Sequence, residues 1–384
     1  MLRLVFWYCF AILLTLSGFV RVSAQTPLLD SAFLVKKKLF TSMQEALKEP
    51  DKVYRLALID EYLQELPTRI SELTSLQYLD ISHNKLTELP TEICDLPNLQ
   101  ILRVRDNQLQ RLPEGIERLQ NLLELDVSIN LITELPPEIK AWKKLKRLFC
   151  QKNRLQSLPE EFGDLQKLEE CHLAQNRITE LPKRFTTCVQ LAEFDCSENK
   201  LTALSDDFAQ LTKLQVLNLT SNKLNALPPK IGSLLQLRRL LLSYNKISVL
   251  PPTVSSLKKL QILRLEFNAL STLPPELGAV AYLQELYLNG NRLTEFPQQV
   301  CNLKSLKILQ LSSNTISALP ENINECANLQ SLHLARNNID VLPQSISRLV
   351  NLRELLIAGN PIAQNTKIID TWRETLANTT VVWR

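Results

Sequence analysis

The sequence predicts an α/β solenoid, in which short repeat units stack into a curved array. A parallel β-sheet is expected on the concave face, with short helical or extended segments on the convex face. Two observations predict this fold: asparagine recurs thirteen times at a spacing of 23 residues without interruption, and leucines keep fixed positions around it. Such a period indicates stacked repeats rather than the two or three domains that 384 residues could form. The asparagines are Asn84, Asn107, Asn130, Asn153, Asn176, Asn199, Asn222, Asn245, Asn268, Asn291, Asn314, Asn337 and Asn360.

Each unit reads L-x-x-L-x-L-x-x-N-x-L-x-x-L-P-x-x-I-x-x-L-x-x, as residues 76–98 show. Leu79 and Ile81 alternate with the period of two that a half-buried strand requires. The second half of the unit carries apolar residues every three or four positions and a proline at a fixed place, which favours tight helical turns or extended segments. No unit can bury its leucines alone, so its neighbours must supply the other wall of the core.

The repeated asparagines have a structural explanation. A buried amide without partners costs about 1–3 kcal/mol, so each one must be hydrogen-bonded. The Asn side chain carries donors and an acceptor, and the chain turns inward after each strand. A stacked asparagine can therefore satisfy its own turn and the adjacent turn, and we assign this column no binding or catalytic role.

This pattern resembles the leucine-rich-repeat (LRR) family, specifically its 23-residue class with a Leu-Pro step, as in Ras-suppressor-like and Scribble-like proteins. The resemblance covers residues 53–360, about 14 units. It implies an LRR horseshoe whose ligands bind on the concave face. Neither end carries the cysteine-rich caps of many eukaryotic extracellular members, so the caps resemble those of exported bacterial members.

The ends depart from the repeat, as stacked arrays require. Residues 41–52 are expected to form a helical cap opened by a Ser42/Glu45 capping box, and residues 25–40 a flexible lead. Residues 361–384 are expected to form a carboxyl-terminal cap with an amphipathic helix over 366–377 and a last strand near Val381.

Residues 1–24 are typical of an export signal: Arg3 precedes an apolar run, and small residues end at Ala24. We expect cleavage there and a secreted or extracytoplasmic protein (cell surface or periplasm) without stable membrane insertion; an uncleaved anchor is the alternative. Removal of Arg3 and Arg21 leaves 42 basic residues against 40 acidic ones, which does not indicate a nucleic-acid binder.

The cysteines are interpreted as small core residues. Cys9 lies in the signal, and five others occupy positions that are apolar in most units: Cys150, Cys171, Cys188, Cys196 and Cys326. A disulfide from Cys171 to Cys188 or Cys196 stays open. The absence of a CxxC pair argues against a metal cluster, and no cofactor motif is present.

The third, fifth and seventh positions of each unit should face outward on the concave sheet. Aromatic, apolar and arginine side chains gather there or next to it, and such residues anchor protein partners. The predicted partner-binding residues are Arg147, Phe149, Arg239, Leu241, Tyr244, Arg264, Glu266, Phe267 and Tyr287.

A second group is acidic. Glu170 and Glu193 are 23 residues apart, as are His172 and Asp195, so each pair should lie side by side. Ser197 completes the residue types of a Ser-His-Asp triad, but it would lie only diagonally from His172 on an open sheet. We interpret the group as an acidic specificity patch, with an ion-binding or hydrolytic site as remote alternatives.

The sequence therefore predicts a secreted recognition module that binds a protein, peptide or glycan on its concave face, with no catalysis, metal or cofactor. The alternative keeps the fold in a membrane-anchored or intracellular scaffold for signal transduction, as the Ras-suppressor resemblance implies.

Overall fold

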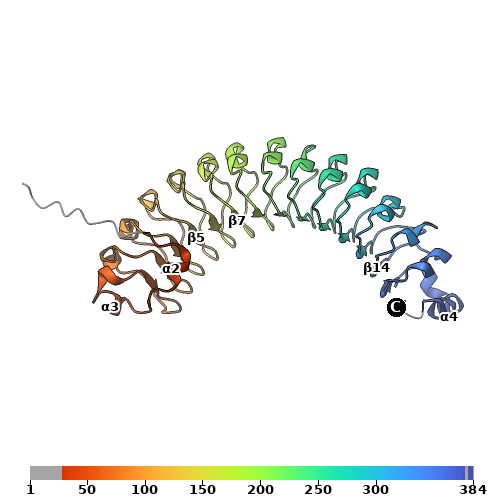
Figure 1. Ribbon diagram of the computed structural model, residues 1–384, viewed down its shortest axis with the longest axis horizontal. Helices are drawn as coiled ribbons and strands as arrows, with labels where there is room; N and C mark the ends of the chain where they lie inside the picture. The colour runs from red at the N-terminus through yellow and green to blue at the C-terminus, as the bar shows by residue number, and fades with distance from the viewer. Residues whose placement is uncertain (1–27, 377–378, 384) are drawn as a thin grey trace, which may run out of the picture.

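The protein is an open arc of stacked coils with its strands on the inner side and its helical turns on the outer side (Figure 1). The computed structural model describes residues 28–376 and 379–383. The expected export signal, residues 1–24, lies outside the described residues. Sixteen strands of the described chain form one sheet in sequence order, and every neighbouring pair is parallel. The α/β solenoid predicted from the sequence is confirmed.

The strands are two or three residues long, and β2 to β15 recur every 23 residues. Their bounds are β1 Leu39–Phe40, β2 Arg55–Ala57, β3 Tyr78–Asp80, β4 Ile101–Arg103, β5 Glu124–Asp126, β6 Arg147–Phe149, β7 Glu170–His172, β8 Glu193–Asp195, β9 Val216–Asn218, β10 Arg239–Leu241, β11 Ile262–Arg264, β12 Glu285–Tyr287, β13 Ile308–Gln310, β14 Ser331–His333, β15 Glu354–Leu356 and β16 Thr380–Val382.

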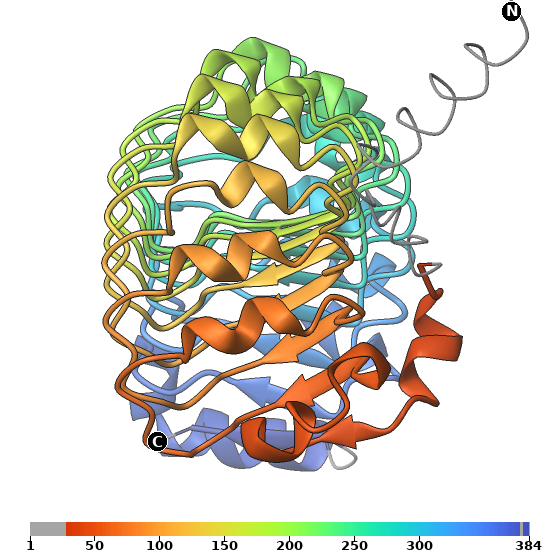
Figure 2. The ribbon, with the colours of Figure 1, turned by 90° about the vertical axis from the view of Figure 1, so that its left-hand side faces the viewer.

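The convex side consists of single 3₁₀ turns, and Figure 2 shows these turns stacked above one another. Fixed prolines precede or open most of them, because proline suits the first turn and cannot continue a longer helix. Their bounds are η1 Pro50–Lys52, η2 Thr68–Glu72, η3 Thr91–Asp95, η4 Ile116–Arg118, η5 Pro137–Ala141, η6 Glu160–Asp164, η7 Lys183–Thr187, η8 Asp206–Gln210, η9 Ile231–Ser233, η10 Pro252–Ser256, η11 Pro275–Ala279, η12 Gln298–Asn302, η13 Ile323–Glu325, η14 Gln344–Arg348 and η15 Pro361–Gln364.

Between the sheet and the turns lies one continuous apolar core. In the unit that begins at Leu76, the side chains of Leu76, Leu79, Ile81 and Leu86 are fully buried. The same positions are buried along the whole array, from Val53 to Ile357. Each coil therefore shields the apolar surface of its neighbours, as the stacking argument requires.

The asparagine column connects consecutive turns by hydrogen bonds. The Asn222 side-chain amide donates to the Leu219 carbonyl of its own turn (3.1 Å) and to the Cys196 carbonyl of the preceding repeat (2.9 Å). Its carbonyl oxygen accepts from the Leu201 backbone N–H of the preceding repeat (2.9 Å). This pattern recurs along the column, for example at Asn84, which accepts from the Glu61 N–H (3.1 Å) where the first unit lacks its own asparagine. The predicted structural role is confirmed.

The residue before each of these asparagines has a left-handed backbone. Its φ is +57° at His83, +58° at Tyr244 and +54° at Phe267, and glycine occupies the position at Gly290 with φ +65°. A side chain in this conformation costs about 1–2 kcal/mol. The cost is offset by the asparagine hydrogen bonds of the same turn, and polar, charged, aromatic and aliphatic side chains are therefore all found at this position.

The buried cysteines compensate for large neighbours. Phe185 and Phe194 pack with their ring centroids 4.8 Å apart in the middle of the array, where other units carry isoleucine or leucine. Cys171 and Cys188 replace leucines nearby, which keeps the total core volume nearly constant. Burial raises the pKa of the Cys188 thiol to about 12, so it stays protonated at neutral pH. All seven cysteines of the described residues are free and buried, and no disulfide joins Cys171 to Cys188 or Cys196.

Both ends of the core are covered. At the amino end, helix α3 (Met43–Ala46) begins after its N-cap Ser42. At the carboxyl end, helix α4 (Thr366–Thr375) contributes Ile369 and Trp372 to the core, and β16 pairs with β15. None of the helices in the described ranges is long and apolar enough to cross a membrane.

The expectation of a lead without structure is wrong for residues 28–40. Helix α2 (Ser31–Val35) and strand β1 form there, and Leu34 and Phe40 are buried. The Arg55 guanidinium donates to the Val35 carbonyl at 2.7 Å and fixes this segment to the first repeat. The apolar residues of this segment follow neither the helix period nor the strand period. Only its tertiary contacts therefore reveal that it extends the cap.

We predict that replacement of one column asparagine weakens the whole array. Asn222→Ala leaves two buried carbonyls and one N–H without their partner, so the free energy of unfolding should fall by about 2–4 kcal/mol. Urea unfolding followed by circular dichroism measures this loss. The control is Asn328→Ala, an exposed asparagine with one hydrogen bond, to the Lys304 carbonyl, where we expect a change of about 0.5 kcal/mol or less. Equal losses in both variants would contradict the assigned role.

Candidate binding surface

The concave face is formed by the first and third residues of each strand. In β10, Leu240 is fully buried in the core, whereas Arg239 is exposed and Leu241 is half-buried. The same positions of consecutive strands lie side by side, so Leu241 neighbours Arg264, which in turn neighbours Tyr287. Because the backbone register is fixed, the surface is a grid of side chains with a spacing of about 4.8 Å between strands.

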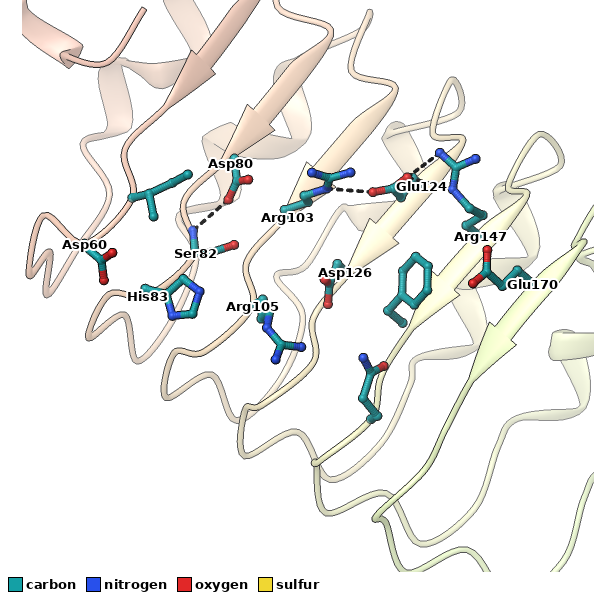
Figure 3. A pocket seen from close by; sticks show the side chains of 13 residues that line it. Asp60, Asp80, Ser82, His83, Arg103, Arg105, Glu124, Asp126, Arg147 and Glu170 are labelled. Carbon is teal, nitrogen blue, oxygen red and sulfur yellow. Dashed lines mark hydrogen bonds and ion pairs between the residues drawn. The ribbon is translucent and has the colours of Figure 1, made fainter. Parts of the chain in front are cut away.

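The amino-terminal half of this face contains a hollow of about 840 Å³. It lies over β3 to β7 and the turn after β2 (Figure 3), and we call it the polar hollow. Its charged lining residues are Asp60, Asp80, His83, Arg103, Arg105, Glu124, Asp126, Arg147 and Glu170.

Glu124 is held between two arginines at the rim of the polar hollow. Its carboxylate is only 3% exposed and accepts from Arg103 Nε at 2.7 Å and from Arg147 Nε at 2.8 Å. Figure 3 shows the two guanidinium groups on either side of it. Burial raises the pKa of Glu124, but the hydrogen bonds from Arg103 and Arg147 lower it more, so the net pKa is below its usual value. Glu124 is thus a buried anion that fixes the orientation of both arginines.

Glu124 is not among the residues predicted from the sequence, whereas Arg147 is predicted there to bind a partner. The strand register places Arg147 between Glu124 on one side and Glu170 on the other. The guanidinium turns to Glu124, because Glu124 is the more buried carboxylate and also binds Arg103. The alternation of charge along Arg103, Glu124 and Arg147 was the available signal.

The second half of the face carries a stacked pair of aromatic rings. Tyr244 and Phe267 lie with ring centroids 4.6 Å apart and ring planes 17° apart. They are 54% and 47% exposed, respectively. The ring of Phe267 covers Gly290, where an added Cβ would lie 2.6 Å from its Cδ1 atom. The left-handed backbone position thus places both rings just beyond the strand ends, and we call them the aromatic pair.

Tyr287 differs from these exposed residues, and the expectation that its side chain faces outward into the solvent is wrong. Its side chain is only 9% exposed, because the Arg264 guanidinium lies over the ring, 4.4 Å from the centroid. Its hydroxyl donates to Glu285 Oε2 at 2.8 Å. Burial raises the pKa of Tyr287, and the bond to Glu285 adds to this. The Tyr287 ring therefore packs beneath the Arg264 guanidinium, and Arg264 is the residue of the two that is exposed to solvent.

The other predicted partner-binding residues fall into two groups. Arg239 and Leu241 lie on β10 beside Arg264, and Glu266 accepts a hydrogen bond from the Ser243 hydroxyl of the preceding repeat. Phe149 lies on β6 next to His172, with ring centroids 5.2 Å apart. Three strands separate β6 from β10, so the structure does not unite these groups into one patch.

The residues of the acidic patch lie side by side in the strand register, as the 23-residue spacing predicts. They do not form a Ser-His-Asp triad. Glu170 lies opposite Glu193, and His172 lies opposite Asp195. Asp195 accepts from the Ser197 hydroxyl at 2.6 Å and from the Asn218 amide at 3.0 Å. Ser197 therefore donates to Asp195, while His172 Nε2 faces Glu170 at 3.0 Å and Glu193 at 3.6 Å.

Models of known repeat families match most of the array. The family described as "Leucine-rich repeat region" matches residues 53–127, and that described as "Leucine rich repeat" matches 167–224 and 281–323. Another described as "Leucine Rich Repeat" matches 236–257 and 328–349. The solved structure of an LRR protein of Leptospira interrogans is 34% identical, with a TM-score of 0.65 over 90% of this chain and 99% of that one. This chain belongs to the leucine-rich-repeat family.

The LRR fold also relates the chain to more distant structures. An internalin (InlF) of Listeria monocytogenes is 20% identical, with a TM-score of 0.64 over 87% of this chain and 88% of that one. Toll, in a complex with Spätzle from Drosophila, is 24% identical, with a TM-score of 0.71 over 84% of this chain and 46% of that one. At these identities the likeness concerns the fold alone. No curated protein sequence matches the chain.

As an LRR protein, the chain presents an interaction scaffold whose variable side chains lie on the concave sheet.

We predict that Glu124 stabilises this LRR sheet in a pH-dependent manner. Glu124→Gln should reduce the free energy of unfolding at pH 7 by about 1–2 kcal/mol, because hydrogen bonds to a charged group contribute about 1.5–3 kcal/mol and both arginines retain access to water.

The direction in which the free energy of unfolding changes with pH follows from the lowered pKa of Glu124. Its stabilising contribution is fully present above the unfolded pKa of about 4.3 and is lost as the pH falls through the lower folded value. Wild type and variant should therefore converge at acid pH in urea unfolding series. Glu138→Gln, an exposed glutamate on the convex side, is the control and should show no such convergence. A constant difference between pH 7 and pH 3 would contradict the prediction.

Proposed function

We propose that this LRR protein is a secreted or surface-exposed recognition module that binds a protein ligand on its concave face and catalyses no reaction. The domain limits given by the sequence, with repeats over residues 53–360 between two caps, form part of this proposal. The observation that carries it is the aromatic pair, Tyr244 and Phe267.

The aromatic pair is costly for the isolated chain. Each ring sits at the left-handed position before a column asparagine, which other repeats fill with residues as different as glycine, serine, isoleucine, glutamine and lysine, so the turn itself requires no aromatic side chain. Both rings also keep about half of their surface in water. Stacking of the two rings stabilises the fold by only about 0.5–1.5 kcal/mol. A binding partner that covers the rings would explain why aromatic residues occupy these two consecutive positions.

The surroundings of the pair favour a protein ligand. Arg239 and Arg264 are exposed on the adjacent strands, and Leu241 lies between them. Exposed aromatic and arginine side chains close together are the residues that dominate protein interfaces. We therefore expect a ligand segment that presents an apolar side chain to the rings and an acidic group to the arginines. A nucleic acid is disfavoured because carboxylates such as Glu266 share this face and the whole chain is nearly neutral.

Recognition requires little rearrangement. The strands on both sides of Arg239 are paired in register, and the following turn is fixed by the hydrogen bonds of Asn245. A preformed surface loses little conformational entropy on binding, which leaves more of the contact free energy as affinity.

We predict that each ring of the aromatic pair contributes substantially to the ligand affinity. The biotinylated protein is used to isolate a ligand from extracellular and cell-surface fractions, and the purified ligand is titrated against variants by surface plasmon resonance. Tyr244→Ala and Phe267→Ala should each weaken binding by about 10–30-fold, as a hot-spot residue does. Tyr282→Ala is the matched control, since Tyr282 is 62% exposed but lies in the turn before β12. Equal affinities for all three variants would remove this site.

We predict that the mature protein begins at Gln25. Amino-terminal sequencing of the protein purified from its native compartment measures this directly. A chain that retains Met1 and sediments with membranes would instead support the anchored scaffold in signal transduction, and a chain that retains Met1 in the soluble cell fraction would support an intracellular one.

A further inference from the structure

Glu170, His172 and Glu193 converge on the concave face in a way that the aromatic pair does not explain. Glu170 and Glu193 occupy the same position of the parallel strands β7 and β8, and His172 lies two residues after Glu170. One oxygen or nitrogen atom of each side chain lies within 4.8 Å of the other two. All three side chains are partly buried.

The distances among these atoms suit a small metal ion. Ligand atoms at about 2.0–2.1 Å from a tetrahedral zinc ion lie about 3.3 Å from each other. His172 Nε2 lies 3.0 Å from Glu170 Oε1 and 3.6 Å from Glu193 Oε1, on either side of that value. The two carboxylate oxygens lie within 4.8 Å of each other, so a site for one ion requires them to approach by at most about 1.5 Å, which partly exposed side chains can do by rotation.

His172 Nε2 is also an unsatisfied atom. It is shut off from water and forms no hydrogen bond, although it approaches Glu170 to 3.0 Å. Buried polar atoms are normally hydrogen-bonded, and each exception calls for a physical explanation. A metal ion between the nitrogen and the two carboxylates would provide the missing partner.

The charge of the group is not neutralised by its neighbours. Like charges directly opposite each other on adjacent strands are destabilising. Arg147, the nearest arginine in register with Glu170, is bound to Glu124 instead. Among the described residues, the ion pairs of Glu170 and Glu193 are those with His172. Asp195 does not join the group, because Ser197 and Asn218 occupy its oxygens.

We propose that Glu170, His172 and Glu193 form a binding site for a zinc-like divalent cation. One imidazole and two carboxylates are zinc-ligand types and supply three protein ligands, the number found in open zinc sites, which keep a fourth coordination position. The imidazole favours zinc over calcium and magnesium, which take oxygen ligands. Because Glu170 also lines the polar hollow, the open position borders the ligand-binding face.

The chain contains a matched pair that lacks this arrangement. On β14 and β15, His333 Nε2 lies 2.9 Å from Glu354 Oε2 and 3.0 Å from the Ser331 hydroxyl. Here only one carboxylate faces the imidazole, because Ser331 occupies the strand position that corresponds to Glu170. The imidazole nitrogen is hydrogen-bonded. The hydrogen bonds from His333 and then Ser331 lower the pKa of Glu354. The His333 pair is therefore a satisfied surface ion pair, and we expect it to bind no metal.

The test is isothermal titration of zinc chloride into the untagged full-length protein after treatment with a chelator. Wild type should bind one zinc ion per chain, and zinc should raise its thermal unfolding temperature. Glu193→Gln keeps the shape of a partly exposed side chain and should weaken zinc binding at least about 10-fold, as should His172→Asn. His333→Asn is the control and should bind as wild type does.

Circular dichroism of each variant without metal verifies that it is folded. The proposal would be overturned by no zinc binding by wild type, by equal affinities of wild type and Glu193→Gln, or by an equal loss in His333→Asn. Tighter binding of calcium than of zinc would also overturn it, because the histidine would then not be a ligand. Because the titration involves no protein ligand, its result is independent of the proposed recognition function.

Discussion

The hydrogen bonds of the buried asparagines between consecutive turns are the constraint on which the structure depends. Each side chain bonds to backbone groups of two successive repeats, as Asn222 does with Leu219 in its own turn and with Cys196 and Leu201 in the one before. A repeat with one residue more or fewer would displace its asparagine and leave these groups buried without partners, at a cost of about 1–3 kcal/mol each. The spacing of 23 residues therefore persists without interruption.

This constraint leaves the concave face free to vary. The turn geometry is set by the asparagine, so the residue before it can be tyrosine, phenylalanine, lysine or aspartate despite its left-handed backbone. The outward strand positions are equally independent of the core, since the central residue of each strand alone enters it. The chain uses this freedom differently along the arc. A buried glutamate between two arginines shapes the first half, and two stacked rings project from the second.

The interior shows a similar division between a fixed frame and local adjustment. Phe162, Phe185 and Phe208 replace isoleucine in three consecutive units, and cysteines replace leucines around them. Each substitution alone would leave a cavity or overfill the core, but together they preserve its volume. The cysteines of this region are explained by packing, and burial keeps the Cys188 thiol protonated. Redox or metal chemistry is not needed to account for them.

The sequence by itself determined the solenoid, the parallel sheet, the burial of the leucines and the role of the asparagines, because each of these follows from periodicity. It also placed Glu170 beside Glu193, since equal positions in consecutive repeats become neighbours. Only the tertiary structure decided which of several neighbouring groups each side chain contacts. Arg147 turns to Glu124 rather than to Glu170, Tyr287 lies beneath Arg264, and residues 28–40 pack on the first repeat. Periodicity fixes where a side chain starts, but its final direction depends on the competition among several partners within reach, and that competition is settled by burial and charge in three dimensions.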